Sequence, residues 1–306
     1  MSVVVMDRQV RRRQSEPRGS VSLASARGRK RWRHILLRAA ASGLFVVAAL
    51  VFLAPLLIVV ITALQPESAI IQRGPAALPE QFTLSNFGQA WGQGDLGRYY
   101  LNSFLILVVK VPLGVVVTAL AAYPLATMRF RARKFLLVLL LVGLGVPQVI
   151  ALYPLLIMVS KIGLSGSLWS LLLPYIAFGT PFEVLVMRGA FAGIPRELLE
   201  AARVDGASER YIWARVCIPL VLPAIASLVI LDGVATWNEF VIALALLSNQ
   251  SSYTLPLGIN NLIGEFTSSY TELEAGALIC ILPMVILFFV TRRYLIRGMA
   301  AGAVKG

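Results

Sequence analysis

Long apolar runs separated by short polar links dominate the chain. Several of these runs exceed roughly 18 residues, the length at which an apolar helix can cross a bilayer. The pattern predicts six such helices, over residues 36–64, 101–128, 135–159, 168–187, 216–247 and 275–291. The chain is therefore expected to be an all-α integral membrane protein with six transmembrane helices.

Composition supports this prediction and divides the chain into two parts. Its 306 residues are 58% hydrophobic, with a mean hydropathy of +0.78. Residues 1–34 form an Arg-, Ser- and Gly-rich arm that we expect to be disordered, and residues 35–306 form one transmembrane domain. The first apolar run has 29 residues, more than the roughly 7–15 of a cleaved signal peptide, so we expect it to remain as a span.

The formal net charge of +13 is concentrated on one side of the expected topology. Lys and Arg gather in the arm, in the link 129–134 and in the tail 292–306, whereas the links after the first, third and fifth spans hold few. Because Lys and Arg mark the cytoplasmic side, both termini and the link between spans four and five are expected there. Beside a span, contact with anionic lipid accounts for the basic arm better than nucleic-acid binding does.

A polar segment over residues 189–215 interrupts this apolar sequence. Pro195 suits the first turn of a short helix, where its missing N–H is not needed. Gly206 can adopt positive φ and end that helix, and Ser208 or Asp205 can cap the next helix, which runs into span five. Taken alone, the pattern also fits an amphipathic helix that lies on the membrane without a partner.

Four ionisable residues lie within the predicted spans. Lys110, Glu183, Asp232 and Glu239 each cost about 2.5–3.5 kcal/mol at the centre of a membrane helix. They are therefore expected to face protein or a water-filled cavity. For Glu183 and Asp232, structural pairing and substrate contact are both open and pairing is favoured, with proton coupling a weaker third possibility. Glu239 lies near the outer end, where water would also account for it.

The fifth span is the longest, and its outer third holds Trp237, Asn238, Glu239 and Phe240. Pro219 and Pro223 at its inner end predict a bend. A long, bent helix that carries polar residues suits a transport pathway better than a lipid-facing wall.

Catalytic and metal chemistry find no support in the sequence. Neither a Ser/His pair nor an Asp pair is available within the spans, and Cys217 and Cys280 have no metal-ligand spacing and are expected to be free. No phosphate-binding loop of the type Gly-x-x-x-x-Gly-Lys-Ser/Thr occurs, so we expect no ATP hydrolysis, catalytic residue, metal or bound cofactor in this chain.

The polar segment resembles the cytoplasmic coupling loop of ABC importer permeases. The residues that carry the resemblance are Glu200, Ala201, Ala202 and Gly206, followed by the ending Val216, Ile218 and Pro219. The resemblance implies the type I importer permease fold and a cleft on a partner ATPase into which this loop inserts. The ATPase-coupling residues would be Glu200, Ala201, Ala202, Asp205, Gly206 and Ala207.

Further segments resemble the carbohydrate-importing branch, typified by maltose and glycerol-phosphate systems. They are residues 79–87, 237–240, 253–258, 275–276 and 302–306. The resemblance implies a substrate pathway at Trp237, Asn238, Glu239 and Asp232, although Trp237 also fits an interfacial anchor. It further implies that Val304, Lys305 and Gly306 contact the ATPase, although a frayed terminus is the simpler alternative.

The sequence thus predicts a permease subunit of an ATP-driven inner-membrane importer for a sugar or sugar derivative, and not an enzyme. Its expected partners are a second permease subunit in a heterodimer, two ATPase subunits carrying ATP and Mg, and an extracytoplasmic solute-binding protein, with no nucleic acid. The alternatives are an ABC importer for a non-sugar solute and an ion-coupled secondary transporter, which would need inverted repeats that the sequence does not show.

Overall fold

The computed structural model describes residues 20–74, 79–93, 95–265 and 269–303, and these contain helices and turns but no strand. The chain forms two compact units, Met1–Ile58 and Val59–Gly306. Each is described by itself.

Helix α1 (Ser20–Ala63) supplies the described part of the first unit, and its last turn belongs to the second. Its apolar part, Ala40–Ala63, is long enough to cross a membrane. Because α1 begins at Ser20, it includes residues 20–34 of the basic arm. Ala, Leu, Arg and Lys favour helix, and a helix that already exists extends more easily than a new one begins.

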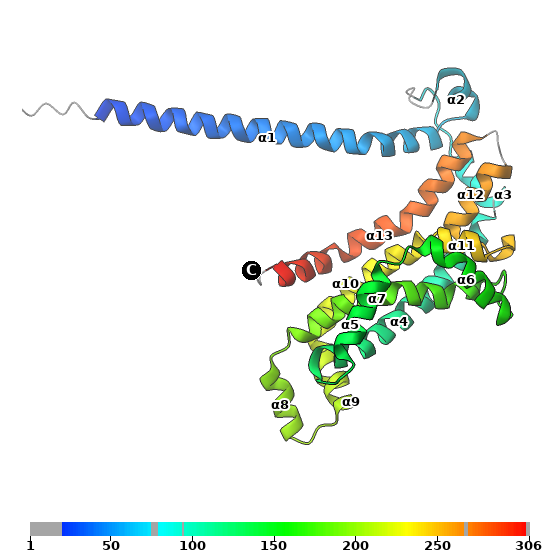
Figure 1. Ribbon diagram of the computed structural model, residues 1–306. Coiled ribbons are helices and arrows are strands. Elements are labelled where there is room, and N and C mark those ends of the chain that lie inside the picture. The colour runs from blue at the N-terminus through cyan, green and yellow to red at the C-terminus, as the bar shows by residue number, and fades with distance from the viewer. Residues whose placement is uncertain (1–19, 75–78, 94, 266–268, 304–306) are drawn as a thin grey trace, which may run out of the picture. The chain divides into compact units, whose positions relative to one another are not determined.

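The second unit contains the remaining helices, and Figure 1 shows α8 and α9 at one end of it and α2, α3 and α12 at the other. The α-helices are α2 (Glu67–Arg73), α3 (Ser85–Gln93), α4 (Leu96–Thr127), α5 (Arg133–Leu144), α6 (Gln148–Lys161), α7 (Leu172–Ala192), α8 (Arg196–Val204), α9 (Glu209–Tyr211), α10 (Ile218–Trp237), α11 (Val241–Leu246), α12 (Leu255–Glu265) and α13 (Tyr270–Ala303). Two short 3₁₀ helices, η1 (Leu168–Leu171) and η3 (Gln250–Ser252), and one π-helical turn, η2 (Ile212–Cys217), complete the elements.

Five stretches among the described residues are helical, long and apolar enough to cross a membrane, and a sixth is present if α5 and α6 form one span. The unbroken third span predicted over residues 135–159 is wrong, because α5 and α6 meet at a bend of 102°. The break contains Gly145 and Pro147, and a residue that precedes proline avoids the α conformation.

The predicted fifth span is also too long. Its helix ends at Trp237 rather than continuing to residue 247, so the segment 237–240 forms the end of the span and a turn. The Glu239 carboxylate accepts hydrogen bonds from the amides of Ile242 (2.7 Å) and Ala243 (3.2 Å). A side chain that satisfies the free N–H groups of a first turn starts a new helix, here α11.

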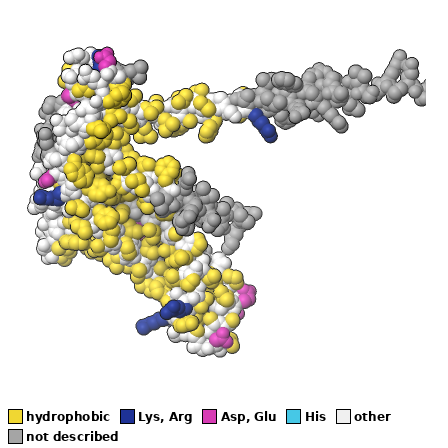
Figure 2. All heavy atoms as spheres, turned by 180° about the vertical axis from the view of Figure 1, so that it is seen from behind, with side chains coloured by type: hydrophobic (Ala, Val, Ile, Leu, Met, Phe, Trp, Pro, Cys, Tyr) yellow, Lys and Arg dark blue, Asp and Glu magenta, His cyan; other side chains and the backbone are white. Residues whose placement is uncertain are grey.

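Helix α4 lies at the centre of the second unit and packs against both α7 and α10. Figure 2 shows apolar side chains over most of the visible face, with most of the charged ones near its ends. Large apolar side chains such as Leu105, Leu139 and Phe288 are exposed. An exterior this apolar is suited to lipid or to other membrane subunits.

The segment between the first two spans is packed rather than loose. Asn86 is 4% exposed, and its side-chain amide donates to the carbonyl oxygens of Ala63 and Gln65, at 2.8 Å each. The amide of Thr83 donates to the Leu64 carbonyl at 2.8 Å. These bonds satisfy carbonyls that the end of α1 would leave without partners, as expected of a packed surface loop.

Candidate functional site

Helix α8 has one face against the protein and one face outward. Leu199 is 4% exposed and Ala202 packs beside it against the apolar core. Glu200, Ala201, Asp205 and the turn at Gly206 are exposed. Of the predicted coupling residues, Ala202 and Ala207 therefore pack on the core and the other four are exposed.

The local structure around α8 follows the sequence prediction. Pro195 occupies the cap position just before Arg196, and Gly206 has φ +80°, a conformation that side chains with a Cβ atom disfavour. The Ser208 hydroxyl, rather than Asp205, caps the next helix by accepting the Tyr211 amide at 3.3 Å.

Glu209 joins α8 to α4. Its carboxylate accepts a hydrogen bond from the Arg203 guanidinium at 2.8 Å and one from the Tyr123 hydroxyl at 2.6 Å. Tyr123 is 4% exposed and packs edge-to-face on Phe191, with ring centroids 5.7 Å apart. The bond to Glu209 raises the pKa of Arg203, so the guanidinium stays charged. We call Arg203, Glu209 and Tyr123 the clasp; sequence reasoning missed it.

A continuous helical path runs from the clasp into the membrane. The short α9 leads into the π turn η2, whose ends Ile212 and Cys217 are fully buried, and then into α10 without a break. The π turn stands directly before Pro219, which cannot donate a backbone hydrogen bond. Residues 209–237 therefore form one continuous helical path that begins at the clasp.

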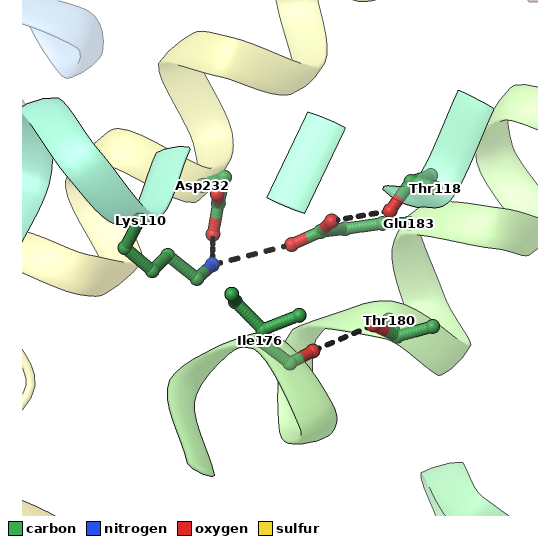
Figure 3. Close-up of polar contacts among 6 residues, drawn as sticks. All are labelled: Lys110, Thr118, Ile176, Thr180, Glu183 and Asp232. Atoms are coloured by element: carbon green, nitrogen blue, oxygen red, sulfur yellow. Dashed lines mark hydrogen bonds and ion pairs between the residues drawn. The ribbon is translucent and has the colours of Figure 1, made fainter. Parts of the chain in front are cut away.

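The most buried polar residue on α10 is Asp232, which meets Lys110 of α4 and Glu183 of α7 (Figure 3). The Lys110 ammonium is paired with Asp232 and lies 3.4 Å from Glu183 Oε1. Glu183 Oε2 accepts a hydrogen bond from Thr118 at 2.8 Å. The three charged side chains are 2–4% exposed. We call Lys110, Glu183 and Asp232 the buried ion cluster.

The buried ion cluster agrees with the pairing predicted for Glu183 and Asp232. Lys110 does not extend toward the membrane surface but pairs inside the bundle. One ammonium faces two carboxylates, and Asp232 Oδ2 has no hydrogen-bond partner within the described residues. The cluster ties α4, α7 and α10 together at one depth.

Four of the five segments that resemble the carbohydrate branch contribute residues to one apolar cluster. Trp237, Leu255 and Ala275 pack with Tyr99 and the end of α1. Trp237 is 2% exposed, donates from its indole nitrogen to the Cys280 carbonyl at 3.1 Å, and packs edge-to-face on Tyr100 at 5.3 Å. Its ring is thus an internal packing group of the second unit.

A close contact explains the glycine in this cluster. A Cβ atom at Gly258 would lie 2.0 Å from the ring of Tyr99, so α12 can approach α4 only with glycine there. The Ser103 hydroxyl accepts the Leu255 amide at 2.8 Å, and the Asn102 side chain donates to the carbonyls of Ser251 and Tyr253, both at 2.9 Å. These motif residues fix the fold at this end of the unit.

The polar residues beside Trp237 have different surroundings. Asn238 is exposed and donates to the Val234 carbonyl at 2.9 Å, whereas Glu239 is half-buried and also accepts the Tyr175 hydroxyl at 2.5 Å. Water at the outer end is therefore not needed to account for Glu239, which anchors the turn between α10 and α11. The structure separates these residues from Asp232, which is buried within α10.

The remaining predictions concern the C-terminal tail, the two cysteines and metal binding. Val304, Lys305 and Gly306 lie outside the described residues. Cys217 and Cys280 are free. Over the part of the chain that the structure describes, no group of three or more His, Cys, Asp or Glu side chains could hold a metal ion.

Comparison with known proteins now identifies the family. Residues 111–300 match the family described as "Binding-protein-dependent transport system inner membrane component", which is more than half of the chain. The chain belongs to this family. The permease is thus an inner-membrane transport subunit of an ABC importer and not the enzyme of the system, as predicted.

Relatives cover most of the permease. It is 33% identical over 252 residues to the probable ABC transporter permease protein YurM of Bacillus subtilis, covering 82% of this chain and 83% of that relative. It is 32% identical over 265 residues to the arabinooligosaccharides transport system permease protein AraQ of Halalkalibacterium halodurans, covering 86% and 94%.

A solved structure confirms the fold. The permease superposes with a TM-score of 0.73 on a chain of a bacterial ABC transporter involved in the import of the acidic polysaccharide alginate. The two are 24% identical, and the match covers 85% of this chain and 96% of that one. The predicted fold class and membrane location are therefore confirmed.

Proposed function

We propose that the permease imports a sugar or oligosaccharide that an extracytoplasmic solute-binding protein delivers, with transport powered by a separate ATPase pair. The observation that carries this proposal is the construction of α8. It presents an exposed outward face, it is held to α4 by the clasp, and the turn at Gly206 joins it to the helical path of α9, η2 and α10. A partner that pushes this face moves a membrane-spanning helix.

The orientation in this proposal rests on charge. The links that carry Arg129 and Arg203 are rich in Arg and Lys, so they and both termini are placed in the cytoplasm. The ATPase subunits, with their ATP and Mg, then dock on Glu200, Ala201, Asp205 and Gly206. Ala202 and Ala207 support this surface from behind, because both pack on the core.

Transport follows from the same connections. When the ATPase pair closes, α8 is displaced and α10 tilts with it. The buried ion cluster makes α4 and α7 follow α10, because separating one buried charge from its partners is unfavourable. The bundle therefore moves as a unit and exchanges an inward opening for an outward one, which is the rigid-body form of alternating access.

The substrate part of the proposal rests on the relative AraQ, named for arabinooligosaccharides, and on the segments that resemble the carbohydrate branch. In the pathway, Asn238 presents an exposed amide suited to sugar hydroxyls, while Trp237, Glu239 and Asp232 position the helix that carries it. A second permease subunit completes the pathway, and the tail Val304, Lys305 and Gly306 adds to the ATPase contact.

A substitution on the outward face of α8 tests the ATPase docking. Ala201→Trp places a large ring on the exposed face without touching the core. We expect the purified permease to lose its ATPase partner in mild detergent while keeping its thermal unfolding midpoint. Ala132→Trp, at an exposed position in the link before α5, is the matched control and should keep the ATPase. Normal ATPase recovery and uptake in Ala201→Trp would contradict the proposal.

The substrate class is tested through the solute-binding protein that co-purifies with the permease. Its ligands are screened by thermal shift with arabino-oligosaccharides, other oligosaccharides and amino acids. Stabilisation by a saccharide, together with ATP-dependent uptake of that saccharide in reconstituted vesicles, is the expected result. Stabilisation by an amino acid alone would favour an importer for a non-sugar solute, and uptake without ATP would favour a secondary transporter.

A further inference from the structure

A cavity of about 610 Å³ lies between α8 and the link that joins α4 to α5. Four guanidinium groups line it, those of Arg129, Arg133, Arg196 and Arg203, and Glu200 is its one carboxylate. The cavity is as large as those that hold small molecules, roughly 300–1,000 Å³. The exposed Ala201 does not line it.

Two of the four arginines are held by hydrogen bonds within the protein, and the other two are exposed. Arg133 is half-buried and its Nε donates to the Leu125 carbonyl at 3.0 Å, and Arg203 is held in the clasp. Arg129 and Arg196 are exposed and form no ion pair with any residue that the structure describes. Because Glu209 pairs with Arg203, three positive charges face the single carboxylate of Glu200, which leaves the cavity with an excess of two.

The rest of the lining is apolar. Ala126, Phe191, Ile194 and Leu199 contribute to the wall, and Phe191 and Leu199 are among the buried core residues. The cavity also adjoins the last residues of α4 and α7, Thr127 and Ala192. Because both helices are membrane spans, this is the depth at which lipid headgroups lie.

We propose that this cavity binds the phosphate of an anionic phospholipid, with Arg129 and Arg196 as its principal ligands. Guanidinium groups recognise phosphate oxygens through paired hydrogen bonds, and basic pockets between spans on the cytoplasmic side suit anionic headgroups. The apolar wall accommodates the glycerol and the first acyl carbons of a lipid. An acidic side chain of a protein partner would not need such a wall. The proposal rests on the orientation given under the proposed function.

A bound headgroup would connect α8 with the ends of α4 and α5. The lipid would thus reinforce the attachment of α8 that the clasp begins, and the stability of the docking surface would depend on membrane composition. This makes the leaflet a partner in coupling, through a cavity that shares only Glu200 with the surface on which the ATPase docks.

The test compares lipids on the purified complex. Wild-type protein is placed in nanodiscs of phosphatidylcholine alone or with phosphatidylglycerol, and its thermal unfolding midpoint is measured. We expect phosphatidylglycerol to raise the midpoint, and Arg129→Gln with Arg196→Gln to abolish that rise. Arg131→Gln is the matched control, because Arg131 is exposed in the same link but does not line the cavity. Native mass spectrometry should show at least about tenfold fewer retained phosphatidylglycerol molecules in the double variant than in the control.

Three outcomes would overturn the proposal. An unchanged lipid effect in the double variant would show that the cavity is not the site. Equal stabilisation by inorganic phosphate in phosphatidylcholine would indicate a site for a soluble anion. Loss of the ATPase from the double variant, without any lipid effect in wild type, would assign the arginines to an acidic group of the ATPase. Labelling of Arg131→Cys with a membrane-impermeant maleimide tests independently whether this link is cytoplasmic. A wrong orientation can therefore be distinguished from a cavity that binds no lipid.

Discussion

The hydroxyl of Tyr123 donates a 2.6 Å hydrogen bond to the carboxylate of Glu209, although the two residues are 86 positions apart. Tyr123 belongs to α4, and Glu209 begins the helical path into α10. Glu209 also holds Arg203 of α8. The clasp therefore fixes the proposed docking helix to two membrane spans at once, and its loss should affect coupling more than folding.

Tyr123→Phe tests the clasp with the loss of one oxygen atom. The ring keeps its packing on Phe191, but Glu209 loses a donor. A hydrogen bond to a charged group contributes about 1.5–3 kcal/mol, and the half-exposed Arg203 pair adds less than about 1 kcal/mol because water screens it. We expect an intact complex whose uptake falls severalfold per ATP hydrolysed, measured in reconstituted vesicles.

Tyr211→Phe is the control for Tyr123→Phe, since Tyr211 lies on α9 with Glu209 and has 58% of its surface exposed. Its uptake should match wild type. Equal behaviour of the two variants would show that the clasp does not contribute to coupling.

Gly206 provides a second test of the same region. At φ +80°, proline is excluded because its ring fixes φ near −65°. Gly206→Pro is therefore expected to misdirect α8 and to abolish uptake, while the membrane helices remain folded by circular dichroism. Gly206→Asn is the matched variant, because Asn tolerates left-handed backbone better than other side chains, and it should retain most of the uptake. Full uptake in Gly206→Pro would exclude a coupling role for this turn.

The sequence was sufficient to predict a bundle of membrane helices and the turn at Gly206, because length, apolarity and glycine act locally. The two errors in the spans have local causes that apolarity conceals. The break at Pro147 and the new helix started by Glu239 both occur inside runs of apolar residues. Hydropathy averaged over a window does not detect such breaks, since it depends on residue composition and not on the direction of the backbone.

Long-range partners were harder to predict. The membrane cost of Lys110 and Asp232 indicated that each needs a partner, but 122 residues separate them, and no local rule selects the pair. The clasp gave no such signal, because Glu209 and Arg203 are near water, where an unpaired charge costs little. Trp237 was expected in a pathway or at the membrane surface, and it packs inside the unit instead.

Gly258 offers a test of packing. Gly258→Ala would place a Cβ atom 2.0 Å from a ring carbon of Tyr99, so α12 or α4 must shift. Overpacking of this kind costs about 1–3 kcal/mol, and the thermal unfolding midpoint should fall. The control is Gly189→Ala, on an exposed position of α7 where a Cβ atom meets nothing within 4 Å, which should raise stability by about 0.5–1 kcal/mol. A neutral Gly258→Ala would mean that the contact is relieved without loss.

In the buried ion cluster, the number of unbalanced charges predicts how far each substitution lowers stability. Lys110→Met leaves Glu183 and Asp232 facing each other without a cation, and removal of one partner from a buried pair costs about 3–5 kcal/mol. Asp232→Asn leaves one ammonium with one carboxylate at 3.4 Å, so its cost should be much smaller. The midpoint of thermal unfolding should therefore fall far more in Lys110→Met.

Adding Glu183→Gln and Asp232→Asn to Lys110→Met removes every charge and should recover most of the loss, because a neutral set of similar volume avoids the desolvation of buried ions. If Lys110→Met and Asp232→Asn lower the midpoint equally, Lys110 does not balance both carboxylates, and the link between α4, α7 and α10 must be carried by apolar packing alone.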